Sequence, residues 1–238
     1  MEIIIVTYNN EDTISKCLQS ILNQKYKVKI SIFDNNSSDN TIQEIKKFDY
    51  PFISYFKNIN NIGFGKACNF LARKSDADII LFMNPDLELV SDGLLKAVEE
   101  TFKDDIIKVI GVNHKDYNGI SRTKGVIGNI THNVDRIHIK TNSNKCLYVS
   151  GGFLAIRNKD LKTINYFDED YFMYWEDFDL CLKLHRLYKD CKIITLDNLI
   201  VKHKFQGSKL DFAKRMEYIR QSQIIFTEKW GGCGIYVN

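Results

Sequence analysis

The sequence has only two prolines among its 238 residues, and no stretch of it is rich in proline, glycine and serine. Stretches of that kind are typical of linkers between domains. An internal repeat is also lacking. We therefore predict a single domain over residues 1–238, which is long enough to bury a sizeable core.

Long apolar runs are absent as well. The longest, such as Ile79–Met83, fall far short of the roughly 20 residues that span a bilayer. Ile3–Val6 is too short for the core of a signal peptide and follows no basic segment. These absences predict a cytoplasmic protein, which can still bind peripherally at the inner face of the membrane.

A strong excess of one charge is missing, since the net charge is only +3. Dedicated nucleic-acid binders usually carry a strong basic excess, so we expect no nucleic-acid partner. None of the six cysteines forms a CxxC pair, and several lie in apolar segments. This pattern favours buried, reduced thiols over metal or disulfide roles. A hydrophobic content of 44% and a charged content of 26% are those of an ordinary globular protein.

Short apolar runs alternate with helical patterns in the first hundred residues. The predicted strands cover 3–6, 28–33, 52–56 and 77–83, and the predicted helices cover 12–22, 39–48 and 65–74. Alternation of strands and helices predicts an α/β fold with a Rossmann-like, mostly parallel central sheet that helices flank.

The second half has a less regular pattern. Its predicted helices cover 94–102, 176–188 and 210–229, and its predicted strands cover 106–112, 147–156 and 191–196. Residues 113–145 are polar and are predicted to form a mobile excursion between strands.

Polar residues gather where three of the early strands end. Thr7-Tyr8-Asn9 follows the first strand, Asp34 to Asp39 follows the second, and Asn84-Pro85-Asp86 follows the fourth. Ligands of open α/β sheets bind beyond the carboxyl ends of the strands. The spacing therefore predicts a ligand site at this edge.

Two carboxylates at this edge have alternative explanations. Asp86 is placed to ligate Mg²⁺ or Mn²⁺ on a diphosphate, because such cations prefer oxygen ligands; a polar turn after a strand is the alternative. Asp34 can accept a hydrogen bond from a base N–H. Capping of the next helix by Ser38 or Asp39 is the ordinary explanation of this segment, and both can be true because Asp34 lies outside the cap.

The segment Gly63-Phe64-Gly65-Lys66 contains two glycines before a predicted helix. It follows the third strand and lacks a third glycine, so it is not a dinucleotide fingerprint. Gly65 would allow the backbone to approach a ligand, with Lys66 near a phosphate. A loop shaped by glycines is an equal alternative.

Acidic and aromatic residues alternate over 167–180, directly before a predicted helix. Asp177 lies four residues before Cys181 and so falls on the inward face, where an unpartnered carboxylate is costly. Favourable placement of acids at a helix N-terminus explains Glu176 and Asp179 well but Asp177 poorly.

Two features near the C-terminus are less specific. His203 follows the last predicted strand and is a candidate ligand of a metal or phosphate. The final helix carries Phe212, Met216, Ile219, Phe226 and Trp230 on one face, flanked by basic residues. Core packing is the default explanation for this face, and docking on anionic lipid is the alternative.

Taken together, these motifs resemble family 2 glycosyltransferases of the GT-A fold, in particular the rhamnosyltransferase-like branch that builds O-antigen and capsule polysaccharides. The resemblance covers most of the chain. It is carried by the order and spacing of Val6-Thr7-Tyr8-Asn9, Asp34 to Asp39, Asn61 to Gly65 with Asn69, Phe82 to Asp86, Ser150 to Phe153, Tyr171 to Leu180, and His203.

The resemblance implies a role for each motif. Asp86 would bind Mg²⁺ or Mn²⁺, although Asn84 replaces the family's first acid, and His203 would approach the metal or the diphosphate. Asp34 would recognise a uracil or thymine base, and Asp177 would be the general base. The implied donor-binding residues are Thr7, Tyr8, Asn9, Asp34, Asn36, Gly65, Lys66, Asn84, Gly151, Gly152 and Glu176.

The resemblance also implies a reaction. An inverting transferase would move one sugar, with rhamnose as the first choice, from a dTDP- or UDP-linked donor to a lipid-linked saccharide. Galactose, glucose and N-acetylhexosamine are the alternatives. Residues 1–100 would bind the donor, and 101–238 would form the acceptor side. Two other classes stay open, namely a sugar nucleotidyltransferase and a non-catalytic protein that binds nucleotide sugars.

Overall fold

The computed structural model describes residues 1–123, 129–133, 136–140, 146–204 and 211–230. Its strands are β1 (Glu2–Thr7), β2 (Lys29–Asp34), β3 (Ile53–Lys57), β4 (Ile79–Met83), β5 (Leu87–Leu89), β6 (Ile107–Lys115), β7 (Ser121–Thr123), β8 (Asn129–Asn133), β9 (Arg136–Lys140), β10 (Phe153–Arg157) and β11 (Lys192–His203). Its helices are α1 (Ile14–Asn23), α2 (Thr41–Lys46), α3 (Phe64–Ala72), α4 (Leu94–Thr101), α5 (Asn158–Thr163), α6 (Glu176–Leu187) and α7 (Phe212–Trp230).

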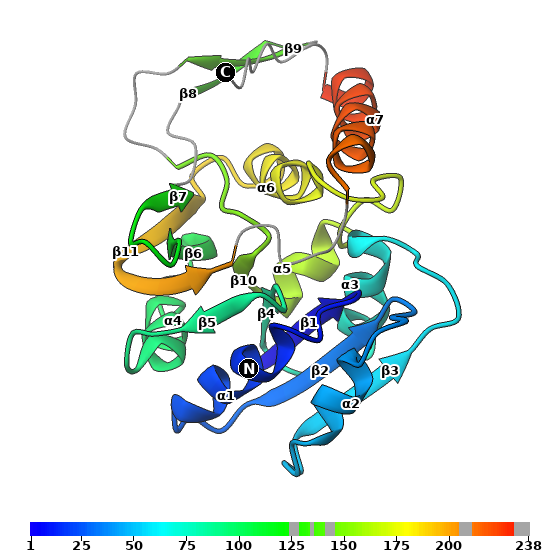
Figure 1. The fold of residues 1–238 in the computed structure, drawn as a ribbon. Coiled ribbons are helices and arrows are strands. Elements are labelled where there is room, and N and C mark those ends of the chain that lie inside the picture. Colours follow the sequence, from blue (N-terminus) through cyan, green and yellow to red (C-terminus); the bar gives the residue numbers. More distant parts are fainter. Residues whose placement is uncertain (124–128, 134–135, 141–145, 205–210, 231–238) are drawn as a thin grey trace.

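One large sheet runs through the described part of the chain in the order β3-β2-β1-β4-β10-β6-β11-β5, with β7 beside β6 (Figure 1). Strands β3, β2, β1 and β4 are parallel. β10 is antiparallel to both β4 and β6, whereas β6 and β11 are parallel. The predicted α/β fold is confirmed, and its parallel region lies mainly in the first half.

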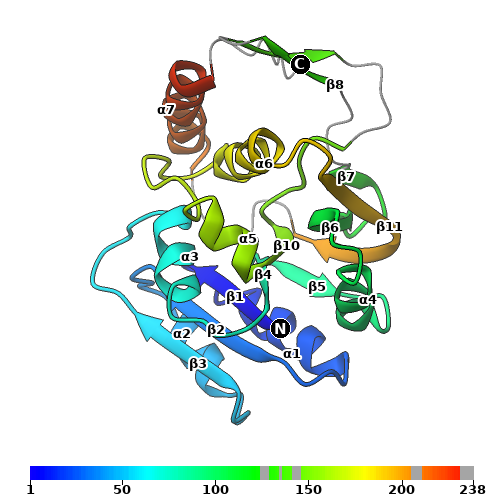
Figure 2. The same ribbon diagram turned by 180° about the vertical axis from the view of Figure 1, so that it is seen from behind.

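Helices cover both faces of the sheet. Alternate residues of β1 point to opposite sides, so that Ile3 and Ile5 join one core cluster and Ile4 and Val6 join another. The first cluster is closed by α1, α2 and α4, and the second by α3, α5 and α6 (Figures 1 and 2). This two-sided burial explains why the central strands are continuous apolar runs.

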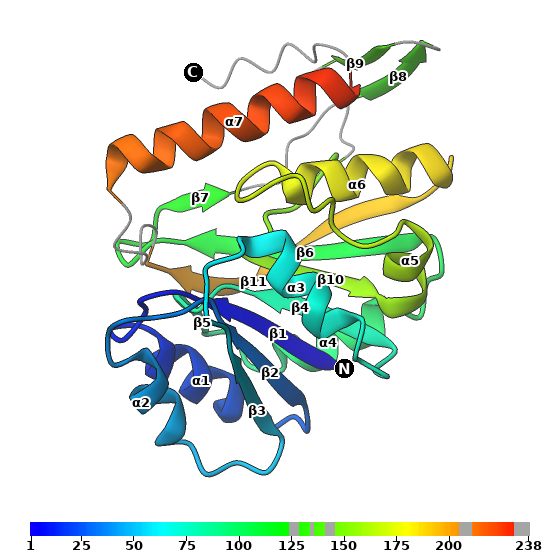
Figure 3. The same ribbon diagram turned by 90° about the vertical axis from the view of Figure 1, so that its right-hand side faces the viewer.

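Helix α7 lies next to α6 as an outer layer (Figure 3). Its buried residues are Ser222, Phe226 and Trp230, and the Phe226 ring stacks on Phe178 with centroids 5.1 Å apart. The predicted apolar face is only partly core, because Phe212 is 74% exposed. No helix in the described ranges is long and apolar enough to cross a membrane.

Several elements differ from the sequence-based expectation. β11 continues to His203 instead of ending near residue 196, and β5 and α5 were not predicted. β5 has three residues, too few to give a periodic pattern. Strands β7, β8 and β9 lie within the interval 113–145, while residues 124–128, 134–135 and 141–145 of that interval lie outside the described residues.

Candidate active site

Sheet topology brings the predicted site residues to one edge. Parallel β1, β2 and β4 all end there, and antiparallel β10 begins there, since Phe153 pairs with Met83. At this edge the Asn84 N–H also donates a hydrogen bond of 2.9 Å to the Gly152 carbonyl. Asn84 and the Gly151-Gly152 pair therefore lie side by side, as the ligand-site prediction requires.

The loops after β1 and β2 are joined by hydrogen bonds. The Asn9 N–H donates to Ser37 Oγ over 2.8 Å, and the Ser38 N–H donates to Asn9 Oδ1 over 2.9 Å. Asn9 and Asn36 both have positive φ, of 56° and 69°, which asparagine tolerates better than most residues. Tyr8 at the tip of the first loop is 39% exposed.

Asp34 is completely buried at the end of β2. Its Oδ2 accepts a 3.0 Å hydrogen bond from the Ser37 N–H. Its Oδ1 is buried and has no hydrogen-bond partner among the described residues. A buried, unpaired carboxylate oxygen is costly, and a ligand N–H would satisfy it. Thr7 differs, because its hydroxyl already donates to Asn10 Oδ1 over 3.0 Å.

Helix α3 begins against the acidic and aromatic segment. Gly63 has φ +87°, and a Cβ there would lie 2.4 Å from the Phe172 carbonyl oxygen. That same carbonyl accepts a 2.9 Å bond from the Phe64 N–H. Gly65 is buried against Phe167, whose Cβ lies 3.3 Å from its ideal Cβ position. Packing within the chain thus accounts for Gly65, and ligand contact by Gly65 or the exposed Lys66 stays a prediction.

Both oxygens of Asp177 are held by backbone amides. Oδ2 accepts a 2.8 Å bond from the Gly151 N–H, and Oδ1 accepts a 2.8 Å bond from the Phe178 N–H. A Cβ on Gly151 would lie 3.3 Å from Asp177 Cβ, so a larger residue there would crowd the Asp177 side chain. Burial raises the pKa of Asp177, and these two hydrogen bonds oppose that rise.

Glu176 is only 6% exposed. Burial, reinforced by the negative charge of Asp177, raises its pKa to about 8. Its Oε2 is buried without a hydrogen-bond partner in the part of the chain that the structure describes. The carboxyl group is therefore mainly protonated at neutral pH. The preceding residues Tyr174 and Trp175 both have φ of 70°, a strained conformation of the kind that gathers at functional sites.

Asp179 lies in the first turn of α6, as predicted, but it is completely buried. Its Oδ1 accepts a 2.8 Å bond from Trp230 Nε1 and lies 2.6 Å from Lys229 Nζ. Ser222 adds a 2.8 Å bond from its hydroxyl to the Met173 carbonyl. Helix α7 therefore fixes the segment that carries Glu176 and Asp177.

The structure brings Asp86 and His203 together. Leu87 pairs with His203 across β5 and β11, and Asp86 Oδ1 lies 3.2 Å from His203 Nε2. Both side chains are 9% exposed. Two ligands at a right angle around Mg²⁺, with bonds of about 2.1 Å, are about 3 Å apart. This oxygen and nitrogen pair therefore fits a divalent cation whose other ligands are phosphate oxygens and water.

His114 was missed by the sequence analysis. It lies at the end of β6, is 1% exposed, and its Nδ1 is 3.2 Å from His203 Nδ1. Burial lowers the pKa of His114 to about 3, with a smaller contribution from His203, so the ring is neutral. The signal that could have found it is the one used for the first strands, namely a polar residue that follows a buried apolar run.

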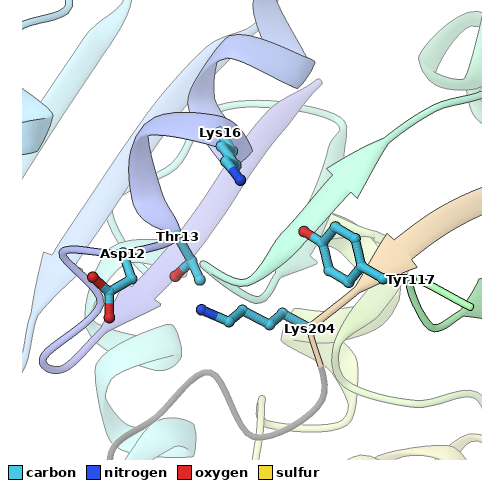
Figure 4. A pocket seen from close by; sticks show the side chains of 5 residues that line it. All are labelled: Asp12, Thr13, Lys16, Tyr117 and Lys204. Atoms are coloured by element: carbon cyan, nitrogen blue, oxygen red, sulfur yellow. The ribbon is translucent and has the colours of Figure 1, made fainter.

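A cavity of about 200 Å³ is lined by Asp12, Thr13, Lys16, Tyr117 and Lys204, the last of which follows directly after β11. Figure 4 shows the two lysine side chains entering it from α1 and from the end of β11. Lys204 also donates its N–H to the Asp86 carbonyl over 3.0 Å. None of the predicted site residues lines this cavity, so it adjoins the site without forming it.

The same fold occurs in solved glycosyltransferases. S. aureus TarS 1–349 in complex with UDP-GlcNAc aligns with a TM-score of 0.66 and 17% identity, over 100% of this chain and 76% of that one. The mannosyltransferase PcManGT from Pyrobaculum calidifontis, in complex with GDP-Man and Mn²⁺, aligns with a TM-score of 0.71 and 15% identity, over 94% of this chain and 64% of that one. The mixed sheet has acidic residues at the C-terminal ends of its parallel strands. Together with these structural likenesses, this arrangement defines the GT-A fold class.

The sequence comparison then gives the family. Residues 2–164 match the model of glycosyl transferase family 2, and because this is more than half of the chain, the chain belongs to that family. It is 30% identical to the rhamnosyltransferase WbbL of Escherichia coli (strain K12) over 210 residues, which is 76% of this chain and 75% of WbbL. The predicted family and fold are thus confirmed.

Proposed function

We propose that this transferase inverts the anomeric carbon as it moves one sugar from a nucleoside-diphosphate donor to a saccharide hydroxyl in surface polysaccharide biosynthesis. The observation that carries the proposal is Asp177. Its carboxylate is held by the Gly151 N–H at the edge where Asp34 and Asp86 also lie. Residues 1–100 bind the donor in this proposal, and residues 101–238 provide the acceptor side.

Asp177 is the general base. The acceptor oxygen forms a bond to the anomeric carbon, the bond from that carbon to the diphosphate oxygen breaks, and the hydroxyl proton passes to the Asp177 carboxylate. Burial raises the pKa of Asp177 and so makes it a stronger base than an exposed aspartate. The Gly151 and Phe178 amides keep the carboxylate in one orientation throughout.

Glu176 has the opposite role. Because its pKa is raised to about 8, it carries a proton at neutral pH and can donate a hydrogen bond. A sugar hydroxyl or a diphosphate oxygen is a suitable acceptor. Adjacent carboxyl groups with different protonation states are a common arrangement in which one group accepts a proton and the other donates a hydrogen bond.

Asp34 recognises the base through Oδ1, which needs a donor. The imide N–H of uracil or thymine is such a donor, and this favours UDP- or dTDP-linked sugars. Rhamnose is the first choice because of the likeness to a rhamnosyltransferase. Galactose, glucose and N-acetylhexosamine are the alternatives, since they need only small changes in the pocket.

Asp86 and His203 are the residues that would hold Mg²⁺ or Mn²⁺. A cation there supplies positive charge against the departing nucleoside diphosphate. Asn84 stands where the family has another acid, and its amide oxygen offers a weaker ligand than a carboxylate. PcManGT was solved with Mn²⁺, which supports a divalent ion in this fold.

Contact with a membrane surface through α7 fits a lipid-linked acceptor at the inner face. Phe212 and Met216 are 74% and 40% exposed on this helix, with Lys214 and Arg220 exposed nearby. Apolar side chains beside basic ones are typical of helices that dock on anionic lipid.

A thermal-shift panel tests the proposal. The protein is heated with dTDP-rhamnose, UDP-glucose, UDP-galactose or UDP-N-acetylglucosamine, each with Mg²⁺ or Mn²⁺, and one donor should raise Tm selectively. Release of nucleoside diphosphate from that donor in the presence of a saccharide should follow. Pyrophosphate formed from a sugar phosphate and a nucleoside triphosphate would instead indicate a nucleotidyltransferase. Selective binding without any transfer or hydrolysis would indicate a non-catalytic binding protein.

A further inference from the structure

We propose that His114 is a positioning residue for His203, holding its ring so that the Nε2 lone pair is available to a cation shared with Asp86 Oδ1. The inference rests on the proposed cation site at Asp86 and His203. It starts from one contact, the 3.2 Å between the Nδ1 atoms of His114 and His203, both in buried side chains. Nothing in the motifs of the sequence pointed to this contact.

The hydrogen-bond inventory of imidazole decides the arrangement. Two facing Nδ1 atoms form a hydrogen bond only if one carries a proton and the other offers a lone pair. A cation bound at His203 Nε2 requires the lone pair of that atom, so the proton of the neutral His203 ring lies on Nδ1. His114 Nδ1 must then accept this N–H, which fixes both the tautomer and the ring plane of His203.

The backbone places His114 for this role. In the parallel pairing of β6 with β11, Val201 is the partner of His114, and His203 follows two residues later on the same face. On its other side the His114 ring meets Gly152, where a Cβ would lie 3.1 Å from His114 Cε1. The ring therefore sits between β11 and the glycine pair and has little freedom to turn.

Three substitutions separate hydrogen bonding from packing. In His114→Asn the side-chain oxygen lies one bond from Cγ, as Nδ1 does, so it can accept the same N–H. In His114→Gln the amide lies one bond further out, near the former Nε2 position, and the contact is lost. His114→Leu keeps similar volume but offers no acceptor. The Gln and Leu variants differ in polarity, so an effect they share reports the contact itself.

The measurement is binding of Mn²⁺ by electron paramagnetic resonance in the presence of saturating UDP, on proteins whose folding is checked by circular dichroism. Removal of such a partner typically weakens metal affinity about 10–100-fold. We expect that loss in His114→Gln and His114→Leu, and an affinity within about threefold of the original in His114→Asn. Equal affinities in all four proteins would overturn the inference.

Nitrogen-15 NMR of the imidazole rings adds a readout that a purely structural role would not move. The chain has five histidines, and the His203 signals are identified by their loss in His203→Asn. With UDP and Mg²⁺, His203 should show a protonated Nδ1 in the original protein and in His114→Asn. A protonated Nε2 in either would refute the inference.

The outcomes separate this inference from the proposed function. If His203→Asn binds Mn²⁺ as tightly as the original protein, the cation site itself is wrongly placed, and His114 then has no positioning role. If His203→Asn weakens binding and His114→Leu does not, the cation site stands and only the role of His114 fails.

Discussion

The substitution Asp177→Asn tests the proposed base most directly. The asparagine has nearly the same shape, but it cannot take a proton from the acceptor hydroxyl. The contribution of a positioned general base is about 10²–10⁴-fold, which corresponds to a barrier higher by about 3–5 kcal/mol. We expect kcat to fall by that factor while the dissociation constant of the donor changes little.

The structure also predicts a cost in stability. Both oxygens of Asp177 accept backbone N–H groups, from Gly151 and from Phe178. Asparagine has one oxygen, so one of these amides would face an NH₂ group and stay unpaired, at a cost of about 1–3 kcal/mol. Burial disfavours the charged form of Asp177 and raises its pKa. Asparagine carries no charge, so the substitution removes this penalty and offsets part of the amide cost. We therefore expect the free energy of unfolding to fall by no more than about 3 kcal/mol, which is the upper end of the amide cost.

The assay combines transfer kinetics under single-turnover conditions with calorimetry of donor binding and thermal unfolding. Asp179→Asn is a matched control, because Asp179 lies on the same helix but binds Trp230 and Lys229 instead of facing the site. Loss of this buried charge should lower stability by about 1–3 kcal/mol. Turnover per folded molecule should stay within a few-fold of the original.

Two results would refute the reasoning. Turnover of Asp177→Asn at the original rate would remove Asp177 from the base role. An equal loss of turnover in Asp179→Asn would show that both substitutions act by displacing α6, so the loss in Asp177→Asn would not reflect proton transfer to Asp177. A loss confined to Asp177→Asn supports the base.

Three further predictions follow from the same site. The pKa of Glu176 is raised from 4.5 to about 8, so between these pH values the folded protein keeps a proton that the unfolded chain releases, and stability should fall as pH rises. Thermal unfolding between pH 5 and 9 should show a smaller fall in Glu176→Gln. An unchanged slope would contradict the pKa assignment. Asp34→Asn presents an NH₂ group to the imide N–H of uracil, so calorimetry should show UDP bound about 10–100-fold more weakly. CDP, whose ring N3 is an acceptor, should bind more tightly to this variant. Equal losses of affinity for both nucleotides would argue against base recognition. Gly151→Ala places a Cβ 3.3 Å from Asp177 Cβ, so kcat should fall by about 10–100-fold at unchanged donor affinity, and a retained kcat would show that the carboxylate tolerates displacement.

Sequence patterns predict the first half of the fold well because β1, β2 and β4 are buried on both faces. Ile3–Val6 and Ile79–Met83 are continuous apolar runs that the structure places in adjacent parallel strands, and polar residues at their ends mark the site edge. The prediction fails where tertiary contacts decide. β11 extends to His203 because it pairs with β5 and β6, although Asp197 and Asn198 interrupt its apolar pattern.

The site shows the same division. Asp177 is identifiable from its helical spacing, whereas the burial of Asp179 depends on Trp230, which lies 51 residues further along the chain. No local pattern contains that information. His114 was within reach of the rule applied to the first strands, because only Asn113 separates it from the apolar run of β6. It was overlooked because the second half lacks the regular alternation that makes strand ends easy to locate.

The glycine pair at the start of β10 connects the two functional sides of the site. The Gly151 N–H holds Asp177 Oδ2, and the Gly152 carbonyl accepts the Asn84 N–H. Gly152 also leaves room for the His114 ring. Since these contacts are made by backbone groups of two adjacent residues, the distance between the proposed base and the proposed cation site is set by the backbone, with no long side chain between them. A rigid spacing of this kind suits a displacement in which the attacking and departing oxygens must stay in line. A Cβ at Gly151 would lie 3.3 Å from Asp177 Cβ and one at Gly152 would lie 3.1 Å from His114 Cε1, so glycine at both positions leaves room for a functional side chain.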